Sequence, residues 1–145
     1  MKKTIIDTGV IIAFFDESDK YCEAVRSFFK TYKGELYSTE SIVTEVSYYF
    51  ENHKKAQLYI IDWIGKGAVK IVNVENSDYP QIHSMMTKYQ DTPMDYADAS
   101  LMMIGEKLKI TEILTIDNDF SIYKFKNGKQ FKNLLQEVLR KKNQK

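Results

Sequence analysis

Short apolar segments alternate with longer stretches of helical periodicity along most of this 145-residue chain. The segments that predict strands are rich in β-branched and other apolar residues, and they cover 3–6, 36–38, 69–74 and 113–116. Helical patterns cover 18–32, 38–50, 54–64, 77–89 and 92–108. A strand–helix order of this kind favours a mainly parallel sheet covered by helices on both sides. The predicted fold is a compact three-layer α/β/α domain, a single unit spanning residues 1–145.

The helix predicted over 92–108 carries one residue that a core-facing helix does not explain. Thr92 supplies an N-cap hydroxyl, Pro93 needs no amide donor, and Asp95 places an acid over the positive end of the helix. The apolar stripe comprises Met94, Ala97, Leu101, Ile104 and Leu108. Asp98 lies at the border of this stripe. A carboxylate there is unfavourable unless a positive or hydrogen-bonding group meets it, so Asp98 is a candidate site residue.

Three further acids occupy comparable positions. Asp7 follows the first predicted strand and Asp117 follows the last, and the carboxyl ends of parallel strands line the ligand crevice of an α/β sheet. Glu45 borders the apolar face of the helix over 38–50. Simpler interpretations remain open, since Asp7 can be a helix N-cap, Asp119 suits a turn or N-cap, and Glu45 can be a surface residue.

Four carboxylates gathered at one crevice repel one another and raise each other's pKa unless divalent cations neutralise them. Oxygen ligands select Mg²⁺ or Mn²⁺ over zinc or copper. His53, His83 and the single cysteine, Cys22, form no zinc-binding spacing and are interpreted as structural or surface residues. Such an acidic metal site suits phosphodiester hydrolysis.

Four segments together closely resemble PIN-domain proteins, particularly the VapC-like toxin ribonucleases. They are Ile5–Gly9, Thr44–Glu45, Pro93–Ala99 and Leu114–Phe120. The resemblance spans nearly the whole chain. It implies a compact α/β/α fold and Mg²⁺- or Mn²⁺-dependent endonucleolytic cleavage of RNA that leaves a 5′-phosphate.

The resemblance also assigns roles residue by residue. It implies that the catalytic residues and metal ligands are Asp7, Glu45, Asp98 and Asp117. Side chains expected to support these ligands without binding the metal directly are Asp119, Asp95, Thr8 and Thr115. The partners it implies are an RNA substrate and an antitoxin protein, and a homodimer is also considered.

The net charge of +1 hides a basic C-terminal region, in which Glu137 is the only acid after Phe120. We expect its lysines to hold the RNA backbone, in particular Lys124, Lys126, Lys129 and Lys132. A solvated terminal helix is the alternative. The Asn127–Gly128 pair predicts a turn within a small hairpin or beside an edge strand.

Two other functions remain open from the sequence. An RNA-binding or structural module with a silent site is one alternative to a metal-dependent nuclease, and an aspartate phosphotransfer domain using Asp7 is another.

Asp7 and Asp16 interrupt the apolar N-terminal segment, so neither a signal peptide nor a membrane span is expected, and we expect a cytoplasmic protein. Five residues are more aromatic than two core-facing stripes require: Tyr48, Tyr49, Phe50, Tyr59 and Trp63. We expect some of them to be exposed and to form a self-association or antitoxin-docking patch, and plain core packing is the alternative.

Overall fold

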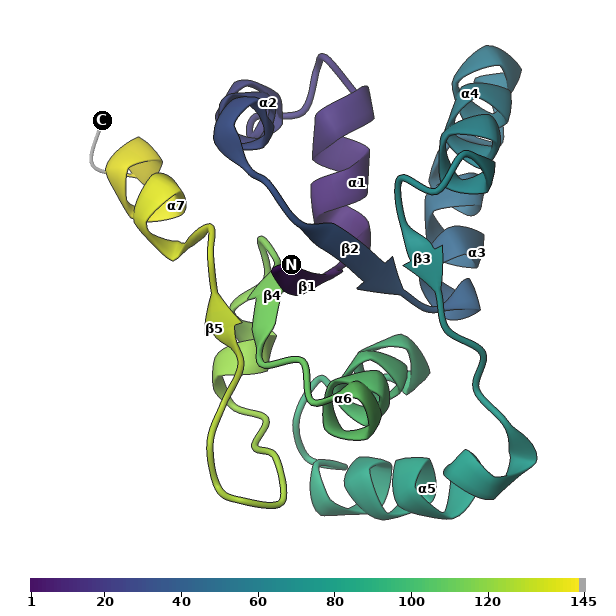
Figure 1. The fold of residues 1–145 in the computed structure, drawn as a ribbon, viewed down its shortest axis with the longest axis vertical. Helices are drawn as coiled ribbons and strands as arrows, with labels where there is room; N and C mark the ends of the chain where they lie inside the picture. The colour runs from purple at the N-terminus through teal and green to yellow at the C-terminus, as the bar shows by residue number, and fades with distance from the viewer. Residues whose placement is uncertain (144–145) are drawn as a thin grey trace.

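The computed structural model describes residues 1–143 and contains one five-stranded sheet (Figure 1). The strands are β1 (Lys3–Ile6), β2 (Glu35–Ser38), β3 (Lys70–Ile71), β4 (Glu112–Leu114) and β5 (Lys132–Asn133). Their order is β3-β2-β1-β4-β5, and every neighbouring pair is parallel. The carboxyl ends of all strands therefore meet at one edge of the sheet, with β1 and β4 side by side at its centre.

Helices cover both faces of this sheet. They are α1 (Thr8–Phe15), α2 (Cys22–Thr31), α3 (Glu40–Tyr49), α4 (Lys54–Gly65), α5 (Tyr79–Lys88), α6 (Tyr96–Leu108) and α7 (Gln136–Asn143). In Figure 1, α1 and α2 lie on one side of the sheet and α5 and α6 on the other, while α3 and α4 stand at its β3 end. The predicted three-layer architecture is confirmed. Among residues 1–143, no helix is both long enough and apolar enough to cross a bilayer.

The core is centred on β1, β4 and α6. Ile5, Ile113 and Leu114 are fully buried on the two central strands. α6 is buried on more than its predicted stripe, because Met102 and Met103 are as inaccessible as the stripe residue Leu101. At Gly105 a side chain would lie 2.7 Å from the Phe131 ring, so only glycine allows the C-terminal segment to cover α6 this closely. The prediction was wrong for Leu108, which is 38% exposed at the open end of the helix.

The start of α6 also differs from the prediction. Thr92 does not cap the helix, because its hydroxyl donates to the Tyr89 carbonyl at 2.6 Å within turns that follow α5. Asp95 is the N-cap: it has an extended backbone, and its carboxylate accepts the Asp98 amide at 2.8 Å. The helix therefore begins at Tyr96, and Pro93 lies in the preceding loop.

Both alternatives for the C-terminal region find support, because β5 is an edge strand and the Phe125 amide donates to the Lys129 carbonyl at 2.8 Å across the turn at Asn127–Gly128. β5 pairs in parallel with β4, Lys132 lying opposite Glu112. The predicted turn is present, since the Gly128 amide donates to the Phe125 carbonyl at 2.9 Å and Gly128 has a φ of +83°. A parallel strand cannot follow β4 through a tight turn, so the intervening chain loops across α6 first.

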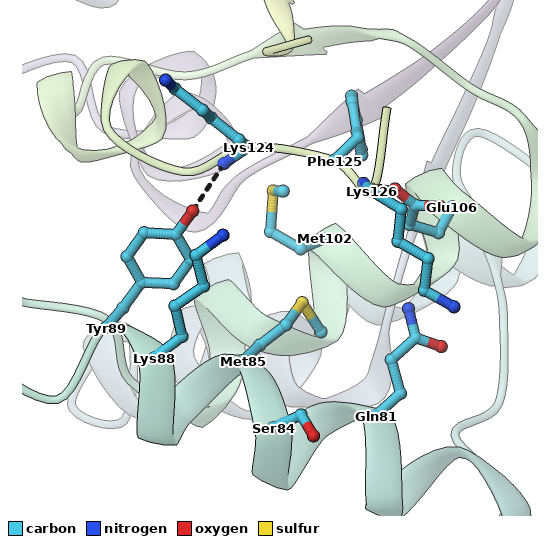
Figure 2. A pocket seen from close by; sticks show the side chains of 10 residues that line it. All are labelled: Gln81, Ser84, Met85, Lys88, Tyr89, Met102, Glu106, Lys124, Phe125 and Lys126. Carbon is cyan, nitrogen blue, oxygen red and sulfur yellow. Dashed lines mark hydrogen bonds between the residues drawn. The ribbon is translucent and has the colours of Figure 1, made fainter. Parts of the chain in front are cut away.

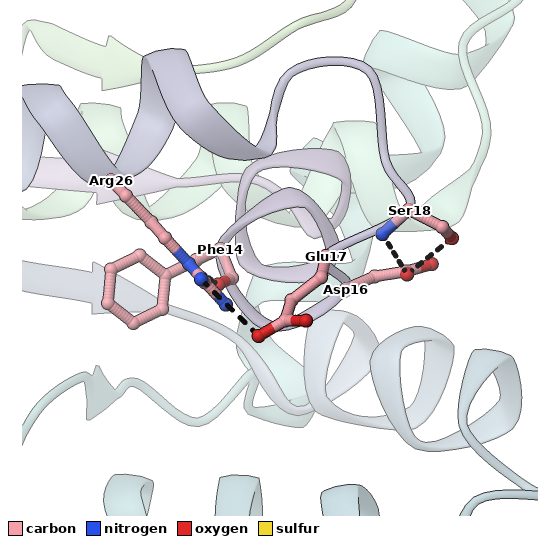
Figure 3. A network of polar contacts seen from close by, with 5 residues as sticks. All are labelled: Phe14, Asp16, Glu17, Ser18 and Arg26. Atoms are coloured by element: carbon pink, nitrogen blue, oxygen red, sulfur yellow. Dashed lines mark hydrogen bonds and ion pairs between the residues drawn. The ribbon is translucent and has the colours of Figure 1, made fainter.

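The far end of α1 is fixed by polar contacts from α2 and from the loop that joins the two helices (Figure 3). Arg26 donates its Nε to the Phe14 carbonyl at 2.9 Å and also lies 3.9 Å from a Glu17 carboxylate oxygen. Asp16 accepts both the amide and the hydroxyl of Ser18. These contacts hold the helix whose other end begins at Asp7.

Candidate active site

Asp7 stands where β1 becomes α1, and both of its carboxylate oxygens are engaged. Oδ1 accepts the Thr8 amide at 2.8 Å, which makes Asp7 the N-cap of α1. Oδ2 accepts the Thr115 hydroxyl at 2.9 Å. The Asp7 amide donates to the Leu114 carbonyl at 3.0 Å, which ties the carboxyl ends of the two central strands together. Asp7 is thus an N-cap and a crevice residue at once.

Thr115 links the two strand-end acids. It is 1% exposed, and its hydroxyl donates to Asp7 while accepting the Asp117 amide at 3.0 Å. Asp117 in turn accepts the Asp119 amide at 2.9 Å, capping a 3₁₀ turn over Asn118–Ser121. These contacts bring together two predicted ligands and two of the predicted supporting residues.

Asn133 on β5 supports Thr115 from the other side. Its side-chain amide donates to the Thr115 carbonyl at 2.9 Å, and its Oδ1 accepts the Thr115 amide at 3.3 Å. Sequence reasoning missed this residue, because the two-residue strand that carries Asn133 is too short to give an alternating pattern. Its role becomes visible only when β5 is placed beside β4.

The partner that Asp98 requires is a tyrosine from the C-terminal segment. The Tyr123 hydroxyl donates to Asp98 Oδ2 at 3.0 Å, and Tyr123 is fully buried between the rings of Tyr89 and Phe120. Burial, reinforced by the charge of Asp98, raises the pKa of Tyr123 far above its usual range, so the phenol stays a donor. Sequence reasoning also missed Tyr123, since nothing local marks it as a contact of a residue 25 positions earlier.

Glu45 joins the site through Thr8. The Thr8 hydroxyl donates to Glu45 Oε1 at 2.6 Å, so α3 contacts the first turn of α1. A second contact sets α3 against α6: the hydroxyls of Thr39 and Ser100 are hydrogen-bonded at 2.8 Å and both residues are fully buried. Glu45 itself is exposed. Its carboxylate is therefore held by the Thr8 hydroxyl rather than by burial.

The electrostatics show that the acids share one environment. Burial raises the pKa of Asp7 to about 6, and the charges of Asp117 and Glu45 contribute to the increase. Burial, followed by the charge of Asp95, raises the pKa of Asp98 to about 7, with Asp7 adding to the effect. The pKa of Asp119 is also raised, first by burial and then by the hydrogen bond and charge of Asp117. Carboxylates in this state favour any cation that enters.

The donor chemistry fits Mg²⁺ or Mn²⁺, because the side chains gathered here offer oxygen atoms and no imidazole or thiolate. Among residues 1–143, no three acidic, histidine or cysteine side chains are grouped closely enough to hold an ion as they stand. Mg²⁺ usually keeps several waters and is held by one or two carboxylates together with substrate phosphates. The open arrangement suits that mode better than a closed protein cage.

The four predicted RNA-binding lysines are all exposed but do not form one row. Lys124 and Lys126 line a pocket between α5, α6 and their own segment. Lys132 lines a different hollow, which Asp117 and Thr115 also line, and Lys129 follows the turn at Gly128. Lys124 and Lys126 thus lie at one pocket, Lys132 lies at another, and Lys129 lies in the loop between them.

Fold and site together define a small α/β protein with a parallel sheet and an acidic crevice at its carboxyl edge. The chain belongs to the PIN domain family, whose model matches residues 4–126. This confirms the resemblance of the four sequence segments.

Individual relatives agree with that assignment. Ribonuclease VapC26 of Mycobacterium tuberculosis is 27% identical over 115 residues, which are 78% of this chain and 85% of that protein. The crystal structure of Mycobacterium tuberculosis VapC20, described as a Sarcin-Ricin loop cleaving toxin, superimposes with a TM-score of 0.75 at 14% identity, covering 82% of this chain and 93% of that one. A toxin–antitoxin complex from Klebsiella pneumoniae superimposes with a TM-score of 0.64 at 13% identity, covering 81% of this chain and 90% of that one. These structures share the fold of this chain.

Proposed function

We propose that this protein is a Mg²⁺- or Mn²⁺-dependent endoribonuclease that hydrolyses RNA phosphodiester bonds. The observation that carries the proposal is the link from Asp7 through the buried Thr115 hydroxyl to Asp117, with Asp98 electrostatically coupled to Asp7. Rigid support of strand-end carboxylates is what a metal-dependent hydrolase requires. The name of the relative Ribonuclease VapC26 supports RNA as the substrate.

In this proposal Asp7, Glu45, Asp98 and Asp117 hold the metal. A bound Mg²⁺ or Mn²⁺ ion supplies an activated water and neutralises charge on the phosphoryl and leaving oxygens. Thr115 fixes the Asp7 carboxylate, and Thr8 fixes that of Glu45. Asp95 and Asp119 add negative charge around these ligands, with Asp95 also starting the helix that carries Asp98.

The basic side chains have a separate role. An acidic crevice repels a polyphosphate chain, so substrate approach needs cations nearby. Lys124, Lys126, Lys129 and Lys132 supply them, the first two at one pocket, Lys132 at another and Lys129 in the loop between. Each phosphate contact would contribute to a salt-dependent affinity for RNA.

We further propose that the protein is the toxin of a toxin–antitoxin pair, acting in the cytoplasm. The Klebsiella pneumoniae complex of the same fold supports this role, and so does an exposed apolar surface on this chain. That surface, the α3–α4 patch, consists of exposed residues of two adjacent helices: Tyr48, Tyr49, Leu58, Tyr59 and Ile61. It suits an antitoxin or a second copy of the chain.

The test is incubation of the purified protein with a mixed RNA pool in Mg²⁺, in Mn²⁺ and in EDTA, beside Asp98→Asn and the surface control Asp62→Asn. We expect internal cleavage only with metal, fragments that carry 5′-phosphates, loss of at least about a hundredfold in Asp98→Asn, and none in Asp62→Asn. RNA binding without cleavage would instead favour a silent-site module. An acyl-phosphate trapped on Asp7 would favour phosphotransfer, although both Asp7 oxygens are already hydrogen-bonded.

A further inference from the structure

A pocket of about 220 Å³ lies beside the acidic crevice, between α5, α6 and the segment 124–126 (Figure 2). Its floor is apolar and is formed by Met85, Met102 and Phe125. Three lysines stand at its rim: Lys88, Lys124 and Lys126.

The pocket adjoins the crevice through two tyrosines. Tyr123, which donates to Asp98, immediately precedes Lys124. The Tyr89 hydroxyl accepts the Lys124 amide at 3.0 Å (Figure 2). The Tyr89 ring also lies 5.2 Å from the Tyr123 ring. Met102 is one helical turn beyond Asp98 on α6. A strand of substrate that passes Asp98 would thus reach the Lys88 and Lys124 end of the pocket next.

The charge and size of the pocket indicate its occupant. Its lining carries three lysines against one acid, Glu106, whose Oε1 already accepts the Lys126 amide at 2.7 Å. Its volume is below the roughly 300–1,000 Å³ of pockets that enclose a drug-sized ligand, so it suits a single flat group better than a whole nucleotide. An apolar floor beneath a cationic rim is the arrangement that stacks an unpaired base and leaves its phosphates at the rim.

We propose that this pocket binds one unpaired base of the RNA substrate, close to the phosphodiester that the crevice cuts. The base packs on Met85 and on the accessible edge of Phe125, with Met102 buried beneath them, and the flanking phosphates contact Lys88, Lys124 and Lys126. This inference rests on the proposed function and adds a position at which the enzyme selects single-stranded RNA. An acidic peptide would also suit the charge, but the continuity with the carboxylates at Asp98 favours RNA.

The experiment measures binding rather than cleavage. A short fluorescein-labelled single-stranded RNA is titrated with the protein in EDTA, and each of its bases is removed in turn to leave an abasic position. We expect one or two adjacent positions at which the missing base weakens binding about tenfold, the order expected for one stacked base. The same positions should lie within a few nucleotides of the bond cut in Mg²⁺.

Variants then locate the effect. Met85→Trp fills the half-buried floor position and should weaken binding of the intact RNA while abolishing the abasic penalty. Lys88→Gln with Lys126→Gln should weaken binding and lower its salt dependence, whereas the exposed Lys55→Gln on α4 should do neither. Because circular dichroism reports folding of each variant, the lysine pair tests the pocket even if Met85→Trp does not fold.

The outcomes separate this inference from the proposed function. A flat abasic profile, or an unchanged profile in folded Met85→Trp, overturns the pocket assignment even if the wild type cleaves RNA. A peaked profile that Met85→Trp removes, without metal-dependent cleavage, keeps the pocket and overturns the nuclease. If an acidic peptide binds the pocket and RNA does not, the assignment to RNA is wrong.

Discussion

At the scale of single residues, Thr115 positions the acids of the site most directly. One buried hydroxyl donates to Asp7 and accepts from the Asp117 amide, so it sets the relative position of two acids that come from different strands. Burial excludes water as a substitute partner. Loss of this hydroxyl should therefore disturb both acids together.

We predict that Thr115→Val lowers the free energy of unfolding by about 1–3 kcal/mol and RNA cleavage by about 10–100-fold, as for other supports of metal ligands. Thr115→Ser, which keeps the hydroxyl, is the control and should retain most activity. Urea denaturation and initial cleavage rates measure the two effects. Wild-type cleavage by a folded Thr115→Val protein would show that the hydroxyl does not position the acids.

The raised pKa values of Asp7 and Asp98 predict how stability depends on pH without metal. The pKa of Asp7 is raised from 3.8 to about 6 and that of Asp98 from 3.8 to about 7. Between the ordinary and the raised pKa of each group, the folded state therefore binds more protons than the unfolded state. Their contribution to stability is present below about pH 4 and is lost as pH rises through 6 and 7. In EDTA, the melting temperature should fall between pH 5 and pH 8 because of these two groups.

Asp98→Asn should reduce that fall and raise the melting temperature at pH 8, because it removes one of the repelling charges. Mg²⁺ should stabilise the wild type by mass action and Asp98→Asn much less. Thermal melts with and without Mg²⁺ at the two pH values provide the measurement. Equal stabilisation of both proteins by Mg²⁺ would remove Asp98 from the set of ligands.

The sequence predicts the acids of the site better than it predicts their partners. Asp7 and Asp117 could be located because each follows a recognisable strand, and Asp98 because it borders an apolar stripe. Tyr123 and Asn133 could not be located. Both reach the site through a loop and a two-residue strand, and their contacts lie 25 and 18 positions away in the chain.

At the scale of elements, the start of α6 shows where local rules compete. Thr92–Pro93 and Asp95 both satisfy the preferences for a helix start. The turns that follow α5 continue through Thr92, whose amide donates to the Tyr89 carbonyl at 3.0 Å. Asp95 therefore becomes the cap, because its carboxylate is the first side chain free to accept the Asp98 amide.

This difference is measurable. Asp95→Ala should lower the free energy of unfolding by about 1 kcal/mol through loss of the N-cap. Thr92→Ala should have a smaller effect, because its hydroxyl bonds the end of a turn rather than the start of α6. Urea denaturation of the two variants in EDTA compares them. A larger loss in Thr92→Ala would place the helix start where the sequence pattern first puts it.

At the scale of the whole molecule, the parallel sheet was predictable and its edges were not. Alternating strands and helices leave few chain paths. In this chain β1 and β4 pair in parallel. β3 and β5 are the two edge strands, so the length of each depends on how many residues pair with a single neighbouring strand. The sequence pattern predicts a strand over residues 69–74, but β3 covers only Lys70–Ile71.

The prediction that some of the five aromatic residues are exposed is confirmed, and the others pack in the core. Tyr48, Tyr49 and Tyr59 are exposed, but Phe50 is 4% exposed, and Trp63 is half-buried against Phe14. Phe50 is buried because it ends α3 on the side that faces the core. The three exposed tyrosines all belong to the α3–α4 patch.

We predict that the isolated protein self-associates through the α3–α4 patch, or that the antitoxin covers it. Sedimentation over a range of concentrations should show a mass that increases for the wild type and remains that of a monomer for Tyr48→Lys with Tyr59→Lys. Lys55→Gln serves as the surface control. A concentration-independent mass, together with no protection of the patch by an antitoxin, would contradict the prediction.

The most direct test of the central claim is calorimetric titration of Mn²⁺ into the metal-free protein and into Asp7→Asn, Glu45→Gln, Asp98→Asn and Asp117→Asn, with Asp62→Asn as the control. The account predicts saturable binding to the wild type and to Asp62→Asn, weakened at least about tenfold in the site variants, since removal of even a supporting group typically has that effect. Mn²⁺ binding of wild-type affinity in all four site variants would contradict it.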